Sequence, residues 1–237
     1  MNRRQSKAVE PAAAPVPEPG AAGAPDLAEL FELGLEHLKA RRWPEAETAL
    51  RQVLAGLKAS PGKDGSPGRP SRLKVLNALG RVLNRQGRYA EAIDCYEHAL
   101  VIDSGNALVF NNLGNSLRKA NESDAAITCL ERAVALSPKE PRFRFNLGHA
   151  LSDRGRLGEA LVQYDKAREL DPGYTEASLN RAFTLLRLGD YANGFPACET
   201  RWSMPGRGPK KPDVPEWAGE SYRGRRLLVY AEQGQGD

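Results

Sequence analysis

Three asparagines of this chain recur at a fixed step: Asn112, Asn146 and Asn180 lie 34 residues apart. A side-chain amide carries both hydrogen-bond donors and an acceptor, so it can satisfy the main-chain N–H and C=O groups of an extended peptide whatever that peptide's side chains are. A row of such amides therefore suits a sequence-tolerant grip on another polypeptide.

Metal and nucleophilic chemistry find little support in the sequence. The chain has three cysteines and three histidines, with no Cys-x-x-Cys or His-x-x-x-His spacing, and metal sites typically need such spacings. None of the histidines stands in an arrangement typical of catalysis. We therefore expect neither a metal site nor a cofactor in this chain.

The positive charge of the chain is concentrated in one stretch. The formal net charge is +4, and residues 201–226 hold seven Lys/Arg against three Asp/Glu, which accounts for the whole excess. A protein that coats nucleic acid spreads basic charge over a face, so we expect no nucleic acid partner.

There is no run of about 18 apolar residues, so we expect no membrane-spanning helix. The basic N-terminus is not followed by an apolar stretch, which predicts no signal peptide and a cytoplasmic location.

The asparagine step is the step of a repeat. Leu-Gly pairs and alanines recur every 34 residues, and each unit reads as two amphipathic helices joined by a short turn that contains Gly or Asn. Small residues at these positions let the two helices of one hairpin cross closely. The matching residues are Leu79-Gly80, Leu113-Gly114 and Leu147-Gly148, then Ala92, Ala126 and Ala160, and finally Ala99, Ala133 and Ala167.

Two of the cysteines follow the same repeat. Cys95 and Cys129 share a place in successive units. Packed helix axes lie about 8–10 Å apart, whereas a disulfide needs Cα atoms about 4.4–6.8 Å apart. We therefore expect both to be free thiols in the core, together with Cys198.

The pattern resembles the tetratricopeptide repeat, in which Leu-Gly is followed by Tyr or Leu, then Ala, and a closing Pro. Residues 73–172 hold three units in phase, and residues 27–58 and 175–203 are similar to two weaker units. The resemblance implies an all-α solenoid of helix-turn-helix repeats over residues 26–203. The first helix of each hairpin would line a concave groove.

The repeats leave further segments around and between them. Residues 1–25 read as a disordered leader. The first unit stands 12 residues too far from the second, which predicts a mobile loop over residues 59–71. Residues 204–226 form a basic, Pro/Gly-rich linker. Residues 227–237 read as a buried strand that runs into a glycine turn, typical of the start of an α/β domain.

In tetratricopeptide folds, certain places of the first helix face the groove, and polar residues occupy many of those places here. The resemblance implies that these residues bind the peptide; an alternative is that the amides bond within their own hairpins or to water. Arg81, together with Arg85, Arg118 and Lys119, adds positive charge, which fits either an acidic partner or a solvated face. The implied peptide-binding residues are Asn112, Asn146, Asn180, Asn77, Asn111, Asn115 and Arg81.

Four motifs follow one another at the end of the chain. They are Gly189-Asp190-Tyr191 with Gly194, Glu199-Thr200-Arg201-Trp202, Trp217-Ala218-Gly219, and Ala231-Glu232-Gln233-Gly234-Gln235-Gly236-Asp237. Together with the repeats they resemble bacterial proteins in which tetratricopeptide repeats are fused to a glycosyltransferase domain, similar to O-linked N-acetylglucosamine transferases. The strand at residues 227–237 would then be the first strand of that domain.

This second resemblance implies that the chain is the acceptor-recognition half of such an enzyme. A nucleotide-sugar donor would be used only together with the rest of the transferase domain. Asp237 would match a general base, although Gly236-Asp237 is equally well a plain turn. Whether the chain is part of an enzyme stays open from the sequence. The rival interpretation is a free-standing scaffold that joins partners, or that self-associates through its concave or terminal faces.

Overall fold

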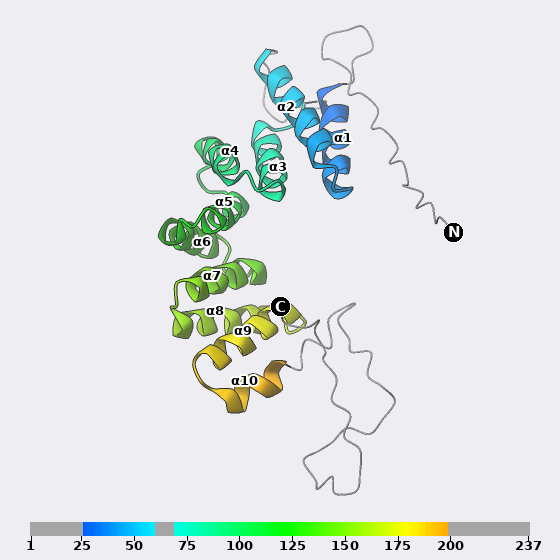
Figure 1. Ribbon diagram of the computed structural model, residues 1–237. Coiled ribbons are helices and arrows are strands. Elements are labelled where there is room, and N and C mark those ends of the chain that lie inside the picture. The colour runs from blue at the N-terminus through cyan, green and yellow to red at the C-terminus, as the bar shows by residue number, and fades with distance from the viewer. Residues whose placement is uncertain (1–25, 60–68, 199–237) are drawn as a thin grey trace, which may run out of the picture.

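The computed structural model describes residues 26–59 and 69–198, and within them the chain folds into five helical hairpins. The hairpins stack one after another into a curved solenoid (Figure 1), which confirms the predicted all-α repeat architecture. The helices are α1 (Leu27–Lys39), α2 (Trp43–Ala59), α3 (Arg72–Arg85), α4 (Tyr89–Ile102), α5 (Ala107–Lys119), α6 (Ser123–Leu136), α7 (Pro141–Asp153), α8 (Leu157–Leu170), α9 (Thr175–Arg187) and α10 (Tyr191–Cys198).

Several of the sequence predictions fall outside the described residues. They are the leader at 1–25, most of the loop expected at 59–71, the linker at 204–226 and the strand at 227–237. The predicted loop is bounded by helices, because α2 continues to Ala59 and α3 begins at Arg72.

The turn inside each hairpin depends on one residue in the left-handed region. This conformation favours Gly and, next to it, Asn. It closes the first helix and redirects the chain into the second within a few residues. The five residues with positive φ in these turns are Arg41, Gly87, Asn121, Gly155 and Gly189.

The glycines of the Leu-Gly pairs mark where the two helices of a hairpin touch. A Cβ added to Gly80 would lie 2.7 Å from the Tyr96 ring, and one added to Gly114 would lie 2.6 Å from Leu130 Cγ. Real Cβ atoms are not found that close, so only glycine fits between these helices. The close crossing predicted from the small residues is therefore confirmed.

Ion pairs tie the first hairpin to the second across the insertion between α2 and α3. Arg88 Nη1 lies 2.6 Å from a carboxylate oxygen of Glu47, and Arg51 Nη2 lies 3.2 Å from Glu91 Oε2. Burial opposes ionisation of Glu47, but hydrogen bonds from Arg88 and Arg51 outweigh it and lower the pKa of that carboxyl. These ion pairs link α2 to the start of α4.

Cys95 and Cys129 form no disulfide, as the sequence predicts, but they lie at the edge of the core and not inside it. Cys198 is buried, whereas Cys95 and Cys129 are half-buried. Burial raises the pKa of Cys95 to about 11.

Within the described ranges, every helix is too short or too polar to traverse a lipid bilayer.

Candidate peptide-binding groove

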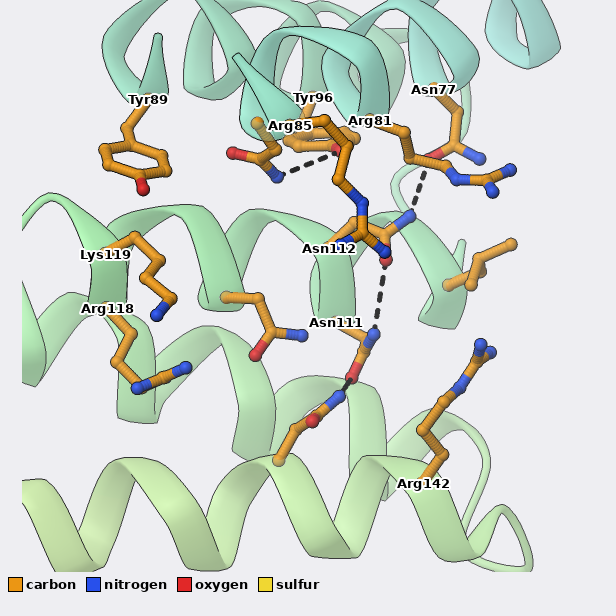
Figure 2. A pocket seen from close by; sticks show the side chains of 14 residues that line it. Asn77, Arg81, Arg85, Tyr89, Tyr96, Asn111, Asn112, Arg118, Lys119 and Arg142 are labelled. Atoms are coloured by element: carbon orange, nitrogen blue, oxygen red, sulfur yellow. Dashed lines mark hydrogen bonds between the residues drawn. The ribbon is translucent and has the colours of Figure 1, made fainter. Parts of the chain in front are cut away.

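A polar groove runs across the first helices of the three central hairpins, α3, α5 and α7. Its volume is about 680 Å³, and Figure 2 shows the side chains that line it. Most of them are amides or cations. The lining residues are Asn77, Arg81, Asn84, Arg85, Tyr89, Tyr96, Leu108, Asn111, Asn112, Asn115, Arg118, Lys119, Arg142 and Asn146.

Four asparagines of the groove form one chain of hydrogen bonds that links the three helices, which we call the amide chain. Asn146 Nδ2 donates to Asn111 Oδ1 over 2.6 Å, Asn111 Nδ2 donates to Asn112 Oδ1 over 3.3 Å, and Asn112 Nδ2 donates to Asn77 Oδ1 over 2.8 Å. Figure 2 shows the chain crossing the groove from α3 to α7. Its members are Asn77, Asn112, Asn111 and Asn146.

The amide chain has a direction, and its two ends keep unused hydrogen-bonding groups. Among the described residues, the Asn77 NH2 group donates to no side chain or main-chain atom and Asn146 Oδ1 accepts from none. Asn111 is only 2% exposed, so its role is to join its neighbours. The Asn115 amide lines the same groove and makes no hydrogen bond within the described part of the chain. The groove therefore offers both donors and acceptors to a ligand.

Asn84 links three helices at the floor of the groove. Its Nδ2 donates to Ser116 Oγ over 2.8 Å and to the Tyr96 hydroxyl over 3.4 Å, and Ser116 Oγ in turn donates to the Asn112 carbonyl. Asn84 Oδ1 is buried and has no partner among the described residues. A buried polar atom without a partner costs free energy, but solvent does not reach this oxygen, so a ligand in the groove does not reach it in this conformation.

The structure brings together six of the seven residues that the sequence predicts for peptide binding. Asn180 is the exception, because its Nδ2 donates to the Glu176 carbonyl of its own helix. It lines a separate recess of about 160 Å³ beside His149 and Arg187. The row therefore does not run along one place of the repeat as expected. Asp237, the candidate general base, lies outside the described residues.

The amides follow neither interpretation throughout. The sequence left two options, a row open to the peptide, or amides bonded within their own hairpins or to water, and Asn180 follows the second because it bonds within its own helix. By contrast, Asn112 and Asn146 bond to residues of the neighbouring hairpin, Asn77 and Asn111. Some hydrogen-bonding groups of these amides hold neighbouring hairpins together, and others face the groove.

The groove is strongly cationic. Arg81, Arg85, Arg118, Lys119 and Arg142 line it, and no Asp or Glu does. Arg118 Nη1 lies 2.8 Å from Asp153 Oδ2 at the edge of the groove. The other four cations form no ion pair with any described residue.

Sequence reasoning missed Asn84 and Arg142 as groove residues. Both occupy repeat places that face the groove in tetratricopeptide folds, which is the signal that would have found them. Neither belongs to the regular asparagine row. The residue 34 positions after Asn84 is Arg118, and Arg142 is itself not an asparagine.

A second recess, which we call the apolar recess, adjoins the groove at the Asn77 end; half of its lining is apolar, and Glu32 and Lys74 are among the polar residues. Its volume is about 450 Å³, and it shares Asn77, Arg81 and Leu108 with the groove. Leu108 is 39% exposed, which is high for a leucine of the inner face. The apolar side chains that line this recess are Phe31, Leu35, Leu73, Ala78 and Leu108.

At the other end of the groove, His149 stands between charges of both signs. Its Nδ1 lies 3.5 Å from Asp153 Oδ2. Burial, together with the positive charge of Arg118, outweighs the effect of Asp153 and lowers the pKa of His149. No group of three or more His, Cys, Asp or Glu side chains in the described residues is placed to hold a metal ion.

Comparison with solved structures finds the same fold in MamA proteins. A crystal structure of MamA is 23% identical, with a TM-score of 0.58 over 71% of this chain and 91% of that one. MamA from Desulfovibrio magneticus RS-1 is 22% identical, with a TM-score of 0.59 over 74% of this chain and 92% of that one. At this level of identity the likeness shows the fold alone. No curated protein sequence matches the chain significantly.

Family models of the tetratricopeptide repeat match almost the whole described region. One model matches residues 26–104 and 71–139, and a second matches residues 111–175 and 147–200. These matches cover well over half of the sequence and coincide with the five hairpins. The chain belongs to the tetratricopeptide repeat proteins.

Proposed function

We propose that this protein is an interaction module that holds an extended peptide in the groove of α3, α5 and α7. The observation that carries the proposal is the amide lining of the groove, in which Asn77, Asn115 and Asn146 keep unused donors or acceptors. An extended peptide presents one N–H and one C=O per residue. Free side-chain amides pair with those groups irrespective of the peptide's sequence.

The hydrogen bonds between the amides support peptide binding in this groove. The amide chain holds Asn77 and Asn146 in place through hydrogen bonds to their neighbours, so less side-chain entropy is lost when a peptide binds. The repeats place first helices side by side at about 8–10 Å. An extended strand advances about 3.3 Å per residue, so about six peptide residues would cross the three helices.

The peptide grip is tested with short fluorescein-labelled peptides, one neutral and one acidic, each made in a normal form and with alternate backbone amides N-methylated. We expect N-methylation to weaken binding of whichever peptide binds by about tenfold, because each lost backbone hydrogen bond is worth roughly 0.5–1.5 kcal/mol. Equal affinity of the methylated and normal forms would contradict the proposal.

Two alanine variants provide a matched pair for the same experiment. Asn115→Ala removes a free amide of the groove, and we expect it to weaken binding several-fold. Asn180→Ala removes an amide that is bonded to its own helix, and we expect no change. A loss for Asn180→Ala alone would mean that the peptide lies across α9 instead.

We further propose that the bound segment is the acceptor of a glycosyltransferase to which these repeats are fused. The support is the ordered set of motifs from Gly189 to Asp237, most of which lies beyond the family matches that end at residue 200. Holding an acceptor near a catalytic cleft raises its local concentration there. In this proposal Asp237 is the candidate base and the nucleotide sugar binds mainly to the remainder of that domain.

A free-standing scaffold is the second candidate, and it is supported by the family matches, which all fall on repeats. The DNA that follows codon 237 separates the two proposals. An open reading frame that encodes alternating strands and helices supports the transferase, whereas an in-frame stop favours the scaffold.

A further inference from the structure

The cations of the groove share a lining that holds no carboxylate. Among the described residues outside the groove, six arginines form ion pairs with carboxylates, whereas other cations, such as Arg132 and Lys166, form none; the six are Arg51, Arg88, Arg154, Arg156, Arg168 and Arg181. Inside it, Arg81, Arg85, Lys119 and Arg142 have no such partner among the described residues, and Asn residues fill the spaces between them. Four cations around one hollow repel one another, so a negatively charged ligand would relieve that repulsion.

The cations flank the amide chain on both sides. In Figure 2, Arg118 and Lys119 lie on one side of it, and Arg81 and Arg142 lie on the other. Successive side chains of an extended peptide point to opposite sides. A peptide whose backbone follows the amide chain would therefore direct each of two consecutive acidic residues toward a cation.

The apolar recess supplies a second element of recognition. It lies beyond Asn77, at the end of the groove formed by α1, α3 and the start of α5, and partly exposed Leu108 lines both spaces. An apolar side chain that entered the recess would bury surface worth about 25 cal/mol per Å². It would also fix which end of the peptide lies over α3.

We infer that the partner of this groove is an internal run of acidic residues with one apolar residue beside it. The acidic run lies over α3, α5 and α7, and the apolar residue enters the recess on the α1 side of α3. This inference rests on the proposed function, because it requires the peptide to lie along the amide chain. It adds which residue types the bound segment contains and in which order they lie along the groove.

The lining favours a peptide over a single-stranded nucleic acid. Nucleic acid grooves combine cations with aromatic platforms on which bases stack. The two aromatic residues in this lining are Tyr89 and Tyr96, and the Tyr96 side chain is fully buried against its own hairpin. Amides that pair with a backbone suit a peptide better.

The inference is tested with the full chain and a fluorescein-labelled probe peptide, Leu-Gly-Glu-Asp-Glu-Glu. The probe is made in two forms, with this sequence and with the reversed sequence. Three comparison probes are its Gln/Asn analogue, its Leu→Gly analogue and an oligo-dT strand. For the better direction, we expect the Gln/Asn analogue to bind at least tenfold more weakly and the Leu→Gly analogue several-fold more weakly. Binding of the acidic probe should also weaken as salt is raised.

The outcomes separate this inference from the proposed function. Equal binding of the acidic and Gln/Asn probes would overturn the inference but leave the peptide grip intact. Binding of none of the peptides would overturn both. Tighter binding of oligo-dT than of the acidic probe would identify a nucleic acid site and overturn the inference, and equal affinity for both chain directions would overturn the order of the segment.

Matched variants locate the site. We expect R85Q/K119Q, which removes two exposed cations of the groove, to weaken the acidic probe about tenfold. R132Q/K166Q removes two exposed cations from α6 and α8 and should leave binding unchanged.

A second matched pair tests the apolar recess. Leu108→Asn should weaken binding of the Leu-containing probe but not of its Gly analogue. Leu170→Asn changes a leucine of similar exposure on α8 and should affect the binding of neither probe. Equal effects of the paired variants would overturn the inference.

Discussion

Asn112 donates a hydrogen bond to Asn77 over 2.8 Å, although the two residues lie 35 positions apart and on different helices. The bond joins α5 to α3 at the surface of the groove rather than in the apolar core. The same side chains thus help to stack neighbouring repeats and line the surface that faces a ligand. Stability and binding are therefore coupled at the amide chain.

Replacement of Asn111 tests the structural half of that coupling. Asn111→Leu would leave Asn146 without its acceptor and Asn112 without its donor. We expect the free energy of unfolding to fall by about 1–3 kcal/mol, because half-buried polar groups lose their partners. Urea denaturation followed by circular dichroism measures it. Asn180→Ala should stay within about 0.5 kcal/mol of the parent, and equal losses for the two variants would contradict the role of Asn111.

Two glycines in helices provide a second matched pair. A Cβ at Gly114 would lie 2.6 Å from Leu130 Cγ and 3.1 Å from the Ala126 carbonyl oxygen, whereas a Cβ at Gly158 would meet nothing within 4 Å. We expect Gly114→Ala to destabilise by about 1–3 kcal/mol through overpacking. Gly158→Ala should stabilise by about 0.5 kcal/mol, because alanine favours the helix. Stabilisation by both substitutions, measured by thermal unfolding, would mean that the hairpin crossing is looser than described.

The lowered pKa of His149 predicts a pH dependence of stability. Burial and Arg118 keep the folded-state pKa below the ordinary value of 6.5, despite Asp153. The unfolded chain therefore binds more protons than the folded chain in this window, and stability falls as the pH drops through 6.5. We expect His149→Gln to lose less stability than the parent between pH 7.5 and pH 5.5, measured by urea denaturation at each pH. Identical pH slopes for variant and parent would contradict this environment for His149.

The raised pKa of Cys95 predicts slow alkylation. With Cys129 and Cys198 replaced by serine, the Cys95 thiol at a pKa of about 11 is almost entirely protonated at pH 8. Because the thiolate is the nucleophile, we expect iodoacetamide to react roughly a hundredfold more slowly with the folded chain than with the chain in urea. A folded-state rate close to the rate in urea would show that the thiol is exposed.

The repeat architecture could be predicted from the sequence because small residues recur at one step. Gly80, Gly114 and Gly148 each sit against a large residue of the second helix, and this geometry permits little besides a tightly crossed hairpin. Such local constraints repeat identically from unit to unit, so the fold follows from the period.

The arrangement of the amides could not be predicted in the same way. Which asparagine meets which depends on the stagger between first helices of neighbouring hairpins, a tertiary quantity that the repeat period does not contain. As a result Asn146 pairs with Asn111 rather than with Asn112, and Asn180 turns back to Glu176. The unpartnered oxygen of Asn84 likewise depends on Ser116 and Tyr96, which come from two other helices.

The most direct test of the groove as a peptide site is the NMR signal of its side-chain amides. The NH2 resonances of a ¹⁵N-labelled chain are assigned by single Asn→Ala variants and followed during titration with the acidic probe peptide. We predict that the signals of Asn77, Asn115 and Asn146 shift in a saturable manner, while those of Asn180 and Asn193 stay in place. Saturable peptide binding that moves only Asn180 or Asn193, or none of these five amides, would contradict the account.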